Sequence, residues 1–123
     1  MRILVVEDDT KVGGFLEVGL REEMFEVDRA CDGHEALVLA GTLEYDLILL
    51  DYMLPKKSGI EVASELRGAG RETPILMLTA RDAPEDWQAA REAGVNALMG
   101  KPFRFAELLD RIRALIQTSP DPT

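Results

Sequence analysis

The sequence predicts an α/β fold: a doubly wound parallel sheet of five strands in the order 2-1-3-4-5, with five helices. Three observations support this prediction. Short apolar runs alternate with helix-forming segments in five units of about 22 to 25 residues, a rhythm typical of parallel sheets with helical crossovers. Three of these runs are apolar throughout, as expected for strands buried on both faces. The length of 123 residues suffices for one domain with a substantial core.

Each predicted strand is a short run bounded by polar or turn-forming residues. The run that begins at Leu47 is the clearest, because Asp51 ends it and Pro55 marks a loop. Residues 25–30 instead alternate apolar and polar side chains, which indicates a strand near an edge. In chain order the predicted strands are Ile3–Val6, Phe25–Ala30, Leu47–Asp51, Pro74–Leu78 and Val95–Met99.

The segments between the strands carry apolar residues at helical spacing. In chain order the predicted helices are Lys11–Glu23, His34–Leu43, Gly59–Arg67, Ala83–Ala93 and Phe105–Ile116. Part of the inner face of the first helix is expected to come from Phe15, Leu16, Val18, Gly19 and Leu20. Asp9 either caps this helix or has a functional role with the acidic residues before it. We expect the domain to span residues 1–117, with residues 118–123 as a linker or disordered tail.

Composition and charge exclude several functional classes. Fourteen Lys and Arg against 23 Asp and Glu give a net charge of −9, which opposes direct binding to nucleic acid or an anionic membrane and favours cations or basic partners. No apolar run approaches the roughly 18 residues of a membrane helix, and the start of the chain becomes acidic too soon for a signal peptide. The single cysteine, Cys31, excludes an internal disulfide and fits a reducing compartment. We therefore expect a cytoplasmic single domain.

Polar residues at the strand ends point to a specific chemistry. Strands 1 and 3 are neighbours in the predicted order, so Glu7, Asp8 and Asp51 should meet in one crevice. Carboxylates this close repel unless a cation lies among them, and oxygen ligands without His or Cys favour Mg²⁺. Strands 4 and 5 add Thr79 and Lys101. A carboxylate nucleophile, a divalent cation, a hydroxyl and an ammonium are the groups needed to move a phosphoryl group onto Asp51.

Four short motifs accompany these strand ends. They are Ile3-Leu4-Val5-Val6-Glu7-Asp8-Asp9, Leu49-Leu50-Asp51-Tyr52-Met53-Leu54-Pro55, Leu78-Thr79-Ala80-Arg81 and Lys101-Pro102-Phe103. In this order and spacing they resemble the receiver domain of bacterial response regulators over residues 2–117. These sequence motifs are most similar to those of regulators that carry a winged-helix DNA-binding domain. The resemblance implies a flavodoxin-like receiver fold and a place in a two-component phosphorelay.

The resemblance also implies a set of site residues. Asp51 would take a phosphoryl group from a sensor histidine kinase or a small phosphodonor. Mg²⁺ would be held by Asp8, Asp51 and the backbone carbonyl of Met53, with Glu7 acting through water. A receiver of this kind is not an enzyme with turnover: it is a phosphoacceptor that assists its own phosphorylation and dephosphorylation.

The resemblance also implies that Lys101 and Thr79 take part in the response to phosphorylation. Lys101 and Thr79 would contact the phosphoryl oxygens, and the Lys101-Pro102 bond would be cis, as is usual in the family. Movement of Thr79 toward those oxygens would shift an existing equilibrium in the surface formed by the fourth helix, fifth strand and fifth helix.

Several residues depart from the family pattern on that surface. Leu98 stands where Tyr or Phe usually acts as a switch, so we expect intact chemistry with an altered readout. Trp87 replaces a common Arg and could anchor a different partner, since interface hot spots favour Trp. Asn96-Ala97 replaces a common Asp-Asp pair. Glu107 and Arg111 match the family's homodimer through this surface, which the replacements weaken.

Two other functions remain open at this point. The first is a protein-interaction module of receiver fold that signals without phosphate, an alternative motivated by Leu98 and the altered fourth helix. The second is a hydrolase or nucleotide-binding enzyme of related topology. It is disfavoured because the chain has neither a Gly-x-Gly-x-x-Gly loop nor a Walker loop.

Overall fold

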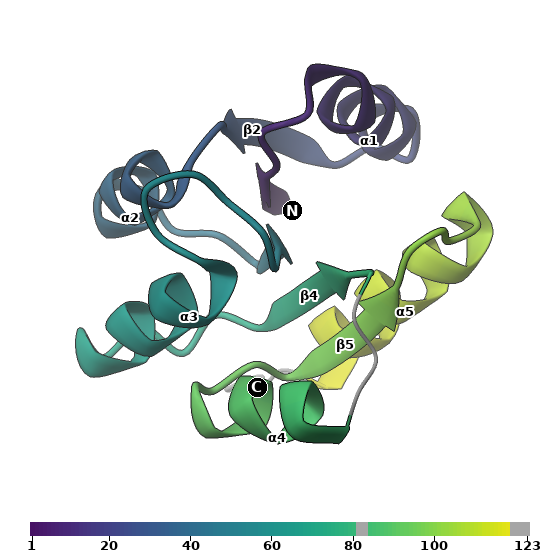
Figure 1. Ribbon diagram of the computed structural model, residues 1–123. Helices are drawn as coiled ribbons and strands as arrows, with labels where there is room; N and C mark the ends of the chain where they lie inside the picture. The colour runs from purple at the N-terminus through teal and green to yellow at the C-terminus, as the bar shows by residue number, and fades with distance from the viewer. Residues whose placement is uncertain (81–83, 119–123) are drawn as a thin grey trace.

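The computed structural model describes residues 1–80 and 84–118, and within them five strands alternate with five helices (Figure 1). The strands are β1 (Arg2–Val6), β2 (Glu26–Ala30), β3 (Leu47–Asp51), β4 (Ile75–Thr79) and β5 (Ala97–Gly100). The helices are α1 (Thr10–Glu22), α2 (Gly33–Thr42), α3 (Gly59–Gly68), α4 (Pro84–Glu92) and α5 (Phe105–Thr118). None of the helices in these ranges is long and apolar enough to cross a membrane.

The strands form one sheet in the order β2-β1-β3-β4-β5, and every neighbouring pair is parallel. This confirms the predicted fold class and strand order. Val6 lies opposite Leu50 across β1 and β3, and Asp51 lies opposite Leu78 across β3 and β4. Because the strands are parallel and in register, their carboxyl ends share one edge, where sheets of this kind bind their ligands.

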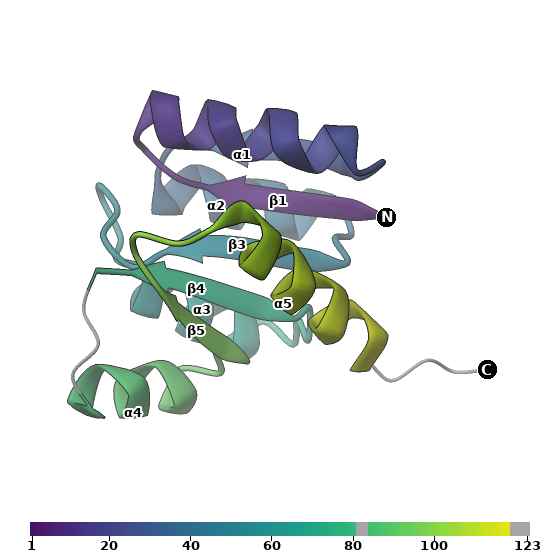
Figure 2. The ribbon, with the colours of Figure 1, turned by 90° about the vertical axis from the view of Figure 1, so that its right-hand side faces the viewer.

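Helices cover both faces of the sheet, as Figures 1 and 2 show from two directions. Side chains of β1, β3 and β4 point alternately to the two faces and are buried on each. One core cluster, on the side of α1 and α5, includes Ile3, Val5, Leu16, Leu49, Leu78 and Ile112. The other, on the side of α2, α3 and α4, includes Leu4, Leu50, Val62, Met77, Ala90 and Leu98. This double burial explains why the strands read as continuous apolar runs.

Side-chain caps fix where three of the helices begin. Asp9 accepts hydrogen bonds from two backbone N–H groups in the first turn of α1, at 2.9 and 3.2 Å. Asp32 caps α2 in the same way, and Ser58 forms a reciprocal capping box with Glu61 at the start of α3. Of the two roles left open for Asp9, the structure therefore shows the cap.

The inner face predicted for α1 is partly wrong. Leu16 and Leu20 are fully buried, but the side chains of Phe15 and Val18 are 57% and 59% exposed. One helical residue corresponds to a rotation of about 100°, so a single turn of the helix cannot direct both Phe15 and Leu16 into the core. α1 therefore presents an apolar strip to solvent as well as one to the sheet.

Some element boundaries also differ from the prediction. β5 begins at Ala97 rather than Val95, because the backbone N–H of Val95 still donates to Ala90 at the end of α4, at 2.9 Å. α5 continues to Thr118, one residue into the expected linker. The predicted motif residue Arg81 lies outside the described residues, as do residues 119–123 of the expected tail.

One side chain ties the end of α3 to the turn before β5. The Arg67 guanidinium donates to the carbonyls of Gly94 and Arg71 and to Asn96 Oδ1, at 3.0, 2.8 and 2.9 Å. Asn96 Oδ1 also accepts the backbone N–H of Ile75 at 2.8 Å. Asn96 therefore joins two strands at the amino edge of the sheet.

Candidate functional site

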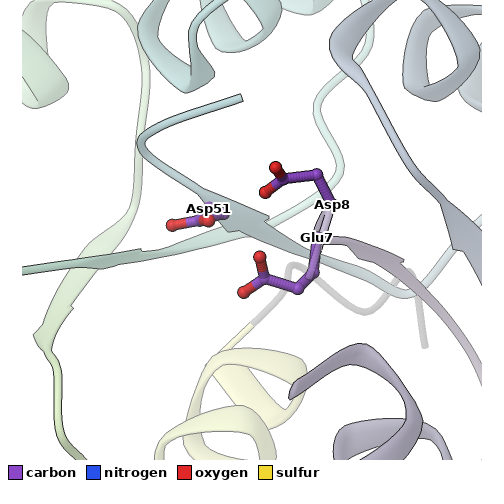
Figure 3. Close-up of side chains that lie close together, drawn as sticks. All are labelled: Glu7, Asp8 and Asp51. Carbon is purple, nitrogen blue, oxygen red and sulfur yellow. The ribbon is translucent and has the colours of Figure 1, made fainter. Parts of the chain in front are cut away.

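Three carboxylates meet at the carboxyl edge of the sheet (Figure 3). Glu7 and Asp8 directly follow β1, and Asp51 ends the neighbouring β3. One ligand oxygen from each residue lies within 4.8 Å of the others. Glu7 and Asp51 are buried, whereas Asp8 is exposed. The cluster predicted from the strand order is thus present, with one side open to solvent.

Lys101 completes the cluster from β5's side of the sheet. Its Nζ lies 2.9 Å from Asp51 Oδ1 and 3.3 Å from Glu7 Oε1. Burial lowers the pKa of Lys101, but its hydrogen bond to Asp51 and the charges of Asp51 and Glu7 outweigh this, so the net shift is upward. The ammonium is therefore charged at neutral pH and sits between two carboxylates. The contact between Lys101 and Glu7 was not foreseen from the sequence.

The ionisation of Glu7 is strongly perturbed. Burial, together with its hydrogen bond to Asp51 and repulsion from that residue, raises the pKa of Glu7 to about 7. The backbone N–H of Asp9, which donates to Glu7 Oε2 at 3.2 Å, and the charge of Lys101 oppose this shift without cancelling it. Near neutral pH, Glu7 is therefore poised between a protonated form and a carboxylate.

Thr79 lies at the end of β4, two strands from Glu7. It is 2% exposed and pairs in register with Gly100 of β5. Its backbone carbonyl accepts the N–H of Lys101 at 2.8 Å, so the hydroxyl-bearing residue and the lysine are held on adjacent strand ends. The Lys101-Pro102 peptide bond is cis.

The loop between β3 and α3 carries Met53, whose side chain is 67% exposed. Gly59, which begins α3 behind this loop, was not recognised from the sequence as part of the site. A Cβ on Gly59 would lie 2.5 Å from the backbone oxygen of Asp51, and its N–H donates to the carbonyl of Tyr52 at 2.9 Å. The first turn of α3 can press against the phosphoacceptor candidate only because this residue has no side chain.

The residues predicted to form an output surface are separate from this cluster. Trp87 on α4 is 37% exposed, and Glu107 and Arg111 on α5 are exposed. Leu98 on β5 is 4% exposed and packs in the core beside α4. A small cavity of about 70 Å³ lies between α4 and β5 and is lined in part by Trp87 and Leu98.

The donor set fits a hard divalent cation. All three side chains offer carboxylate oxygens, and among the described residues this trio is the one acidic or His/Cys cluster with ligand spacing. Mg²⁺ prefers one or two carboxylates and keeps several waters, which suits a cluster with one exposed acid. Lys101 compensates for one of the three negative charges, so the cluster still favours a cation.

Comparisons with known proteins identify relatives in sequence over nearly the whole chain. The probable transcriptional regulatory protein SilR of Salmonella typhimurium is 46% identical over 117 residues, which cover 95% of this chain and 51% of SilR. The transcriptional regulatory protein CusR of Escherichia coli K12 is 44% identical over 117 residues, covering 95% of this chain and 52% of CusR. The chain thus spans about half the length of the curated relatives it matches.

Solved structures show the same fold. The receiver domain of the Francisella response regulator 1452 superposes with a TM-score of 0.90 at 34% identity, covering 94% of this chain and 96% of that one. The response regulator TrrA of Thermotoga maritima, in complex with Mg²⁺ and BeF, gives 0.84 at 36% identity, covering 93% and 97%. The family model of the response regulator receiver domain matches residues 3–113. This chain therefore belongs to the response regulator receiver family.

Proposed function

We propose that the protein is a phosphoacceptor switch of a two-component system, phosphorylated on Asp51. The observation that carries the proposal is the buried Asp51 carboxylate, held 2.9 Å from the Lys101 ammonium and beside two further acids. A carboxylate at a strand end, paired with a cation and beside the exposed Asp8, can act as a nucleophile toward phosphorus. The chain's membership of the receiver family supports the same assignment.

The chain's own groups divide the work of phosphoryl transfer. A carboxylate oxygen of Asp51 attacks phosphorus, and the bond from phosphorus to the donor's nitrogen or oxygen breaks, with its electron pair leaving on the donor. Lys101 is placed to follow the negative charge from Asp51 onto the phosphoryl oxygens, and Thr79 offers a hydroxyl donor on the adjacent strand end. Asp8, Asp51 and the Met53 carbonyl would hold Mg²⁺, with Glu7 acting through water. The bound cation would offset charge on the phosphoryl oxygens.

The output would be a change on the surface formed by α4, β5 and α5. Phosphorylation adds roughly one to two negative charges at Asp51, which draws Thr79 and Lys101 toward the new oxygens. β5 links this event to the surface: Lys101 directly follows Gly100, the last residue of β5, and Leu98 lies two residues before Gly100 in the same strand. Leu98 has neither a ring to expose nor a hydroxyl, so we propose that the readout runs through backbone movement of β5 and α4.

The natural partner would be a sensor histidine kinase that supplies the phosphoryl group. SilR and CusR are named as transcriptional regulatory proteins, and they are about twice as long as this chain. We therefore propose that this domain controls a transcriptional regulator, with DNA contact made outside the domain. Glu107 and Arg111 are exposed where the family's homodimer through α4, β5 and α5 would need them.

The test is intact-mass measurement after incubation with Mg²⁺ and acetyl phosphate. The wild-type chain should gain about 80 Da, one phosphoryl group. Asp51→Asn should remove the adduct, while Asp110→Asn, a matched change at an exposed aspartate of α5, should leave it. Chelation of Mg²⁺ should slow its formation. An adduct that persists in Asp51→Asn would overturn the assignment.

The same experiment separates the alternative of a phosphate-independent interaction module. That function is favoured by one observation, the burial of Leu98 at the position where the family has its aromatic switch. It predicts no adduct in the wild-type chain and no change in the emission of Trp87, the single tryptophan, when Mg²⁺ and a beryllofluoride mimic are added. A shift of that emission in wild type but not in Asp51→Asn supports the phosphoacceptor.

A further inference from the structure

A strip of exposed side chains runs the length of α1 on the side away from the sheet. It consists of Lys11, Phe15, Val18 and Glu22, at spacings of four, three and four residues, which place all four on one helical stripe. Phe15 and Val18 are more than half exposed. The strip is therefore basic at its amino end, apolar in the middle and acidic at its carboxyl end.

The middle of this strip adjoins a hollow shared with α5. Phe15 packs edge-on against Phe105, with ring centroids 5.8 Å apart. Phe105 in turn lies over Gly19, where a Cβ would meet its ring at 2.7 Å. The hollow, of about 590 Å³, is lined by Phe15, Val18, Phe105 and residues of the same α1 face. α1 lies at the outer edge of the molecule, so this face is accessible (Figure 2).

The strip is complementary to itself. When two copies of α1 pack antiparallel about a two-fold axis between residues 16 and 17, Lys11 of each copy faces Glu22 of the other. In the same register, Phe15 of each copy faces Val18 of the other. The distance along the helix between the charged ends, about 16 Å, is then the same in both copies. We propose that this surface is the interface of a symmetric homodimer formed through α1.

The charges of the neighbouring residues support this occupant. Nearby ionic groups are already paired within the chain: Glu17 with Arg21 at 2.9 Å and Glu23 with Arg113 at 2.8 Å. Lys11 and Glu22 take part in no ion pair within residues 1–80 and 84–118. They stand at the two ends of an apolar strip, the arrangement that sets register in a two-fold helix pair. Among the ionic side chains of α1, Lys11 and Glu22 are thus the two without an ion-pair partner in the described part of the chain.

The dimer is expected to be weak and dependent on concentration. One helix face buries less surface than a standard stable interface. Each copy carries a net charge of −9, so long-range repulsion opposes association and is screened at physiological salt, where the Debye length is about 8 Å. The Lys11–Glu22 contacts counter this repulsion locally and select the antiparallel register.

Charge reversal tests the register directly, by sedimentation of the 123-residue chain from about 5 to 500 µM at physiological salt. Lys11→Glu alone and Glu22→Lys alone each place like charges opposite one another twice, and each should raise the dimer dissociation constant about tenfold or more. The double variant should restore it. Mixing the two single variants should restore dimers too, because the heterodimer contains both opposite-charge contacts.

Matched controls locate the interface. Glu44→Lys makes the same charge change as Glu22→Lys, but at an exposed residue before β3, and should leave the dimer as in wild type. Arg111→Glu, on the α4, β5 and α5 surface, should also leave it unchanged. Phe15→Ala should weaken it while circular dichroism shows the same fold, because that side chain is mostly exposed in one copy.

Three outcomes would overturn the proposal. The first is a chain that stays monomeric over the whole concentration range, in which case the strip serves another partner. The second is a dimer that both single charge reversals leave intact. The third is a dimer that Arg111→Glu disrupts and Lys11→Glu does not. None of these outcomes depends on whether Asp51 accepts a phosphoryl group.

Discussion

The buried acid Glu7, beside Asp51, makes the stability of the metal-free protein depend on pH. The pKa of Glu7 is raised from its ordinary value of 4.5 to about 7 in the folded chain. A raised pKa contributes stability that is fully present below 4.5 and is lost as the pH rises through 7. One pKa unit corresponds to about 1.4 kcal/mol, so between pH 5 and pH 8 the loss amounts to about 2–3 kcal/mol.

Glu7→Gln isolates this effect, because glutamine has a similar shape and can still donate to Asp51 but does not titrate. Urea unfolding of both proteins, with a chelator present, gives the free energy of unfolding at each pH. The variant minus wild-type difference cancels the titration of other groups and should grow by about 2–3 kcal/mol from pH 5 to pH 8. A difference that stays constant across this range would refute the reasoning.

Magnesium provides a second arm of the same experiment. The cluster binds a cation better when Glu7 is ionised than when Glu7 is protonated, so ligand binding should stabilise the folded state more at high pH. Millimolar Mg²⁺ should therefore raise the stability of wild type more at pH 8 than at pH 5. Equal stabilisation at both pH values would place the cation away from this cluster.

Three further changes test how the site is held. Gly59→Ala should lower the free energy of unfolding by about 1–3 kcal/mol, because the added Cβ would press on the Asp51 carbonyl. Gly41 has open space around it, so Gly41→Ala should raise the free energy of unfolding by about 0.5–1 kcal/mol in the same urea experiment. Equal effects of the two substitutions would contradict the packing argument. Lys101→Met should lower the free energy of unfolding by about 1–3 kcal/mol at pH 8, because Asp51 loses its ionic partner. An unchanged midpoint of urea unfolding would contradict this expectation. Arg67→Lys should cost about 1–2 kcal/mol by thermal denaturation, because lysine cannot replace three directed hydrogen bonds, and full retention of stability would show them to be dispensable.

The sheet and the acidic cluster were predictable because both follow from chain-local patterns. A strand buried on both faces must be apolar at every position, so runs such as Leu47–Leu50 could be recognised without knowing what covers them. Once the strand order is set, the parallel register brings the residues after β1 and β3 together without any side-chain detail. Glu7 and Asp51 are adjacent for this reason.

The helix faces were less predictable, because apolar residues on two sides of a helix do not say which side meets the sheet. In α1, Leu16 and Leu20 face the core, while Phe15 and Val18 face solvent. The apolar pattern of the sequence alone does not distinguish these four residues. The role of Gly59 was hidden for a related reason: what requires a glycine there is the backbone of Asp51, which is close in space but eight positions earlier in the chain.

The charge of the site explains why, under the proposed function, a divalent cation must accompany the phosphoryl group. Three carboxylates and one ammonium carry a formal charge of −2 when all four groups are ionised, the magnitude that one divalent cation neutralises. Without the cation, burial of Glu7, together with its hydrogen bond to Asp51 and repulsion from that residue, favours a proton on Glu7 and raises its pKa. A phosphoryl group adds roughly one to two further negative charges, which a proton and Lys101 alone cannot offset. Protonation of Glu7 and cation binding are therefore two ways to lower the negative charge of this buried cluster, and under the proposed function only the second leaves the site ready to hold a phosphoryl group on Asp51.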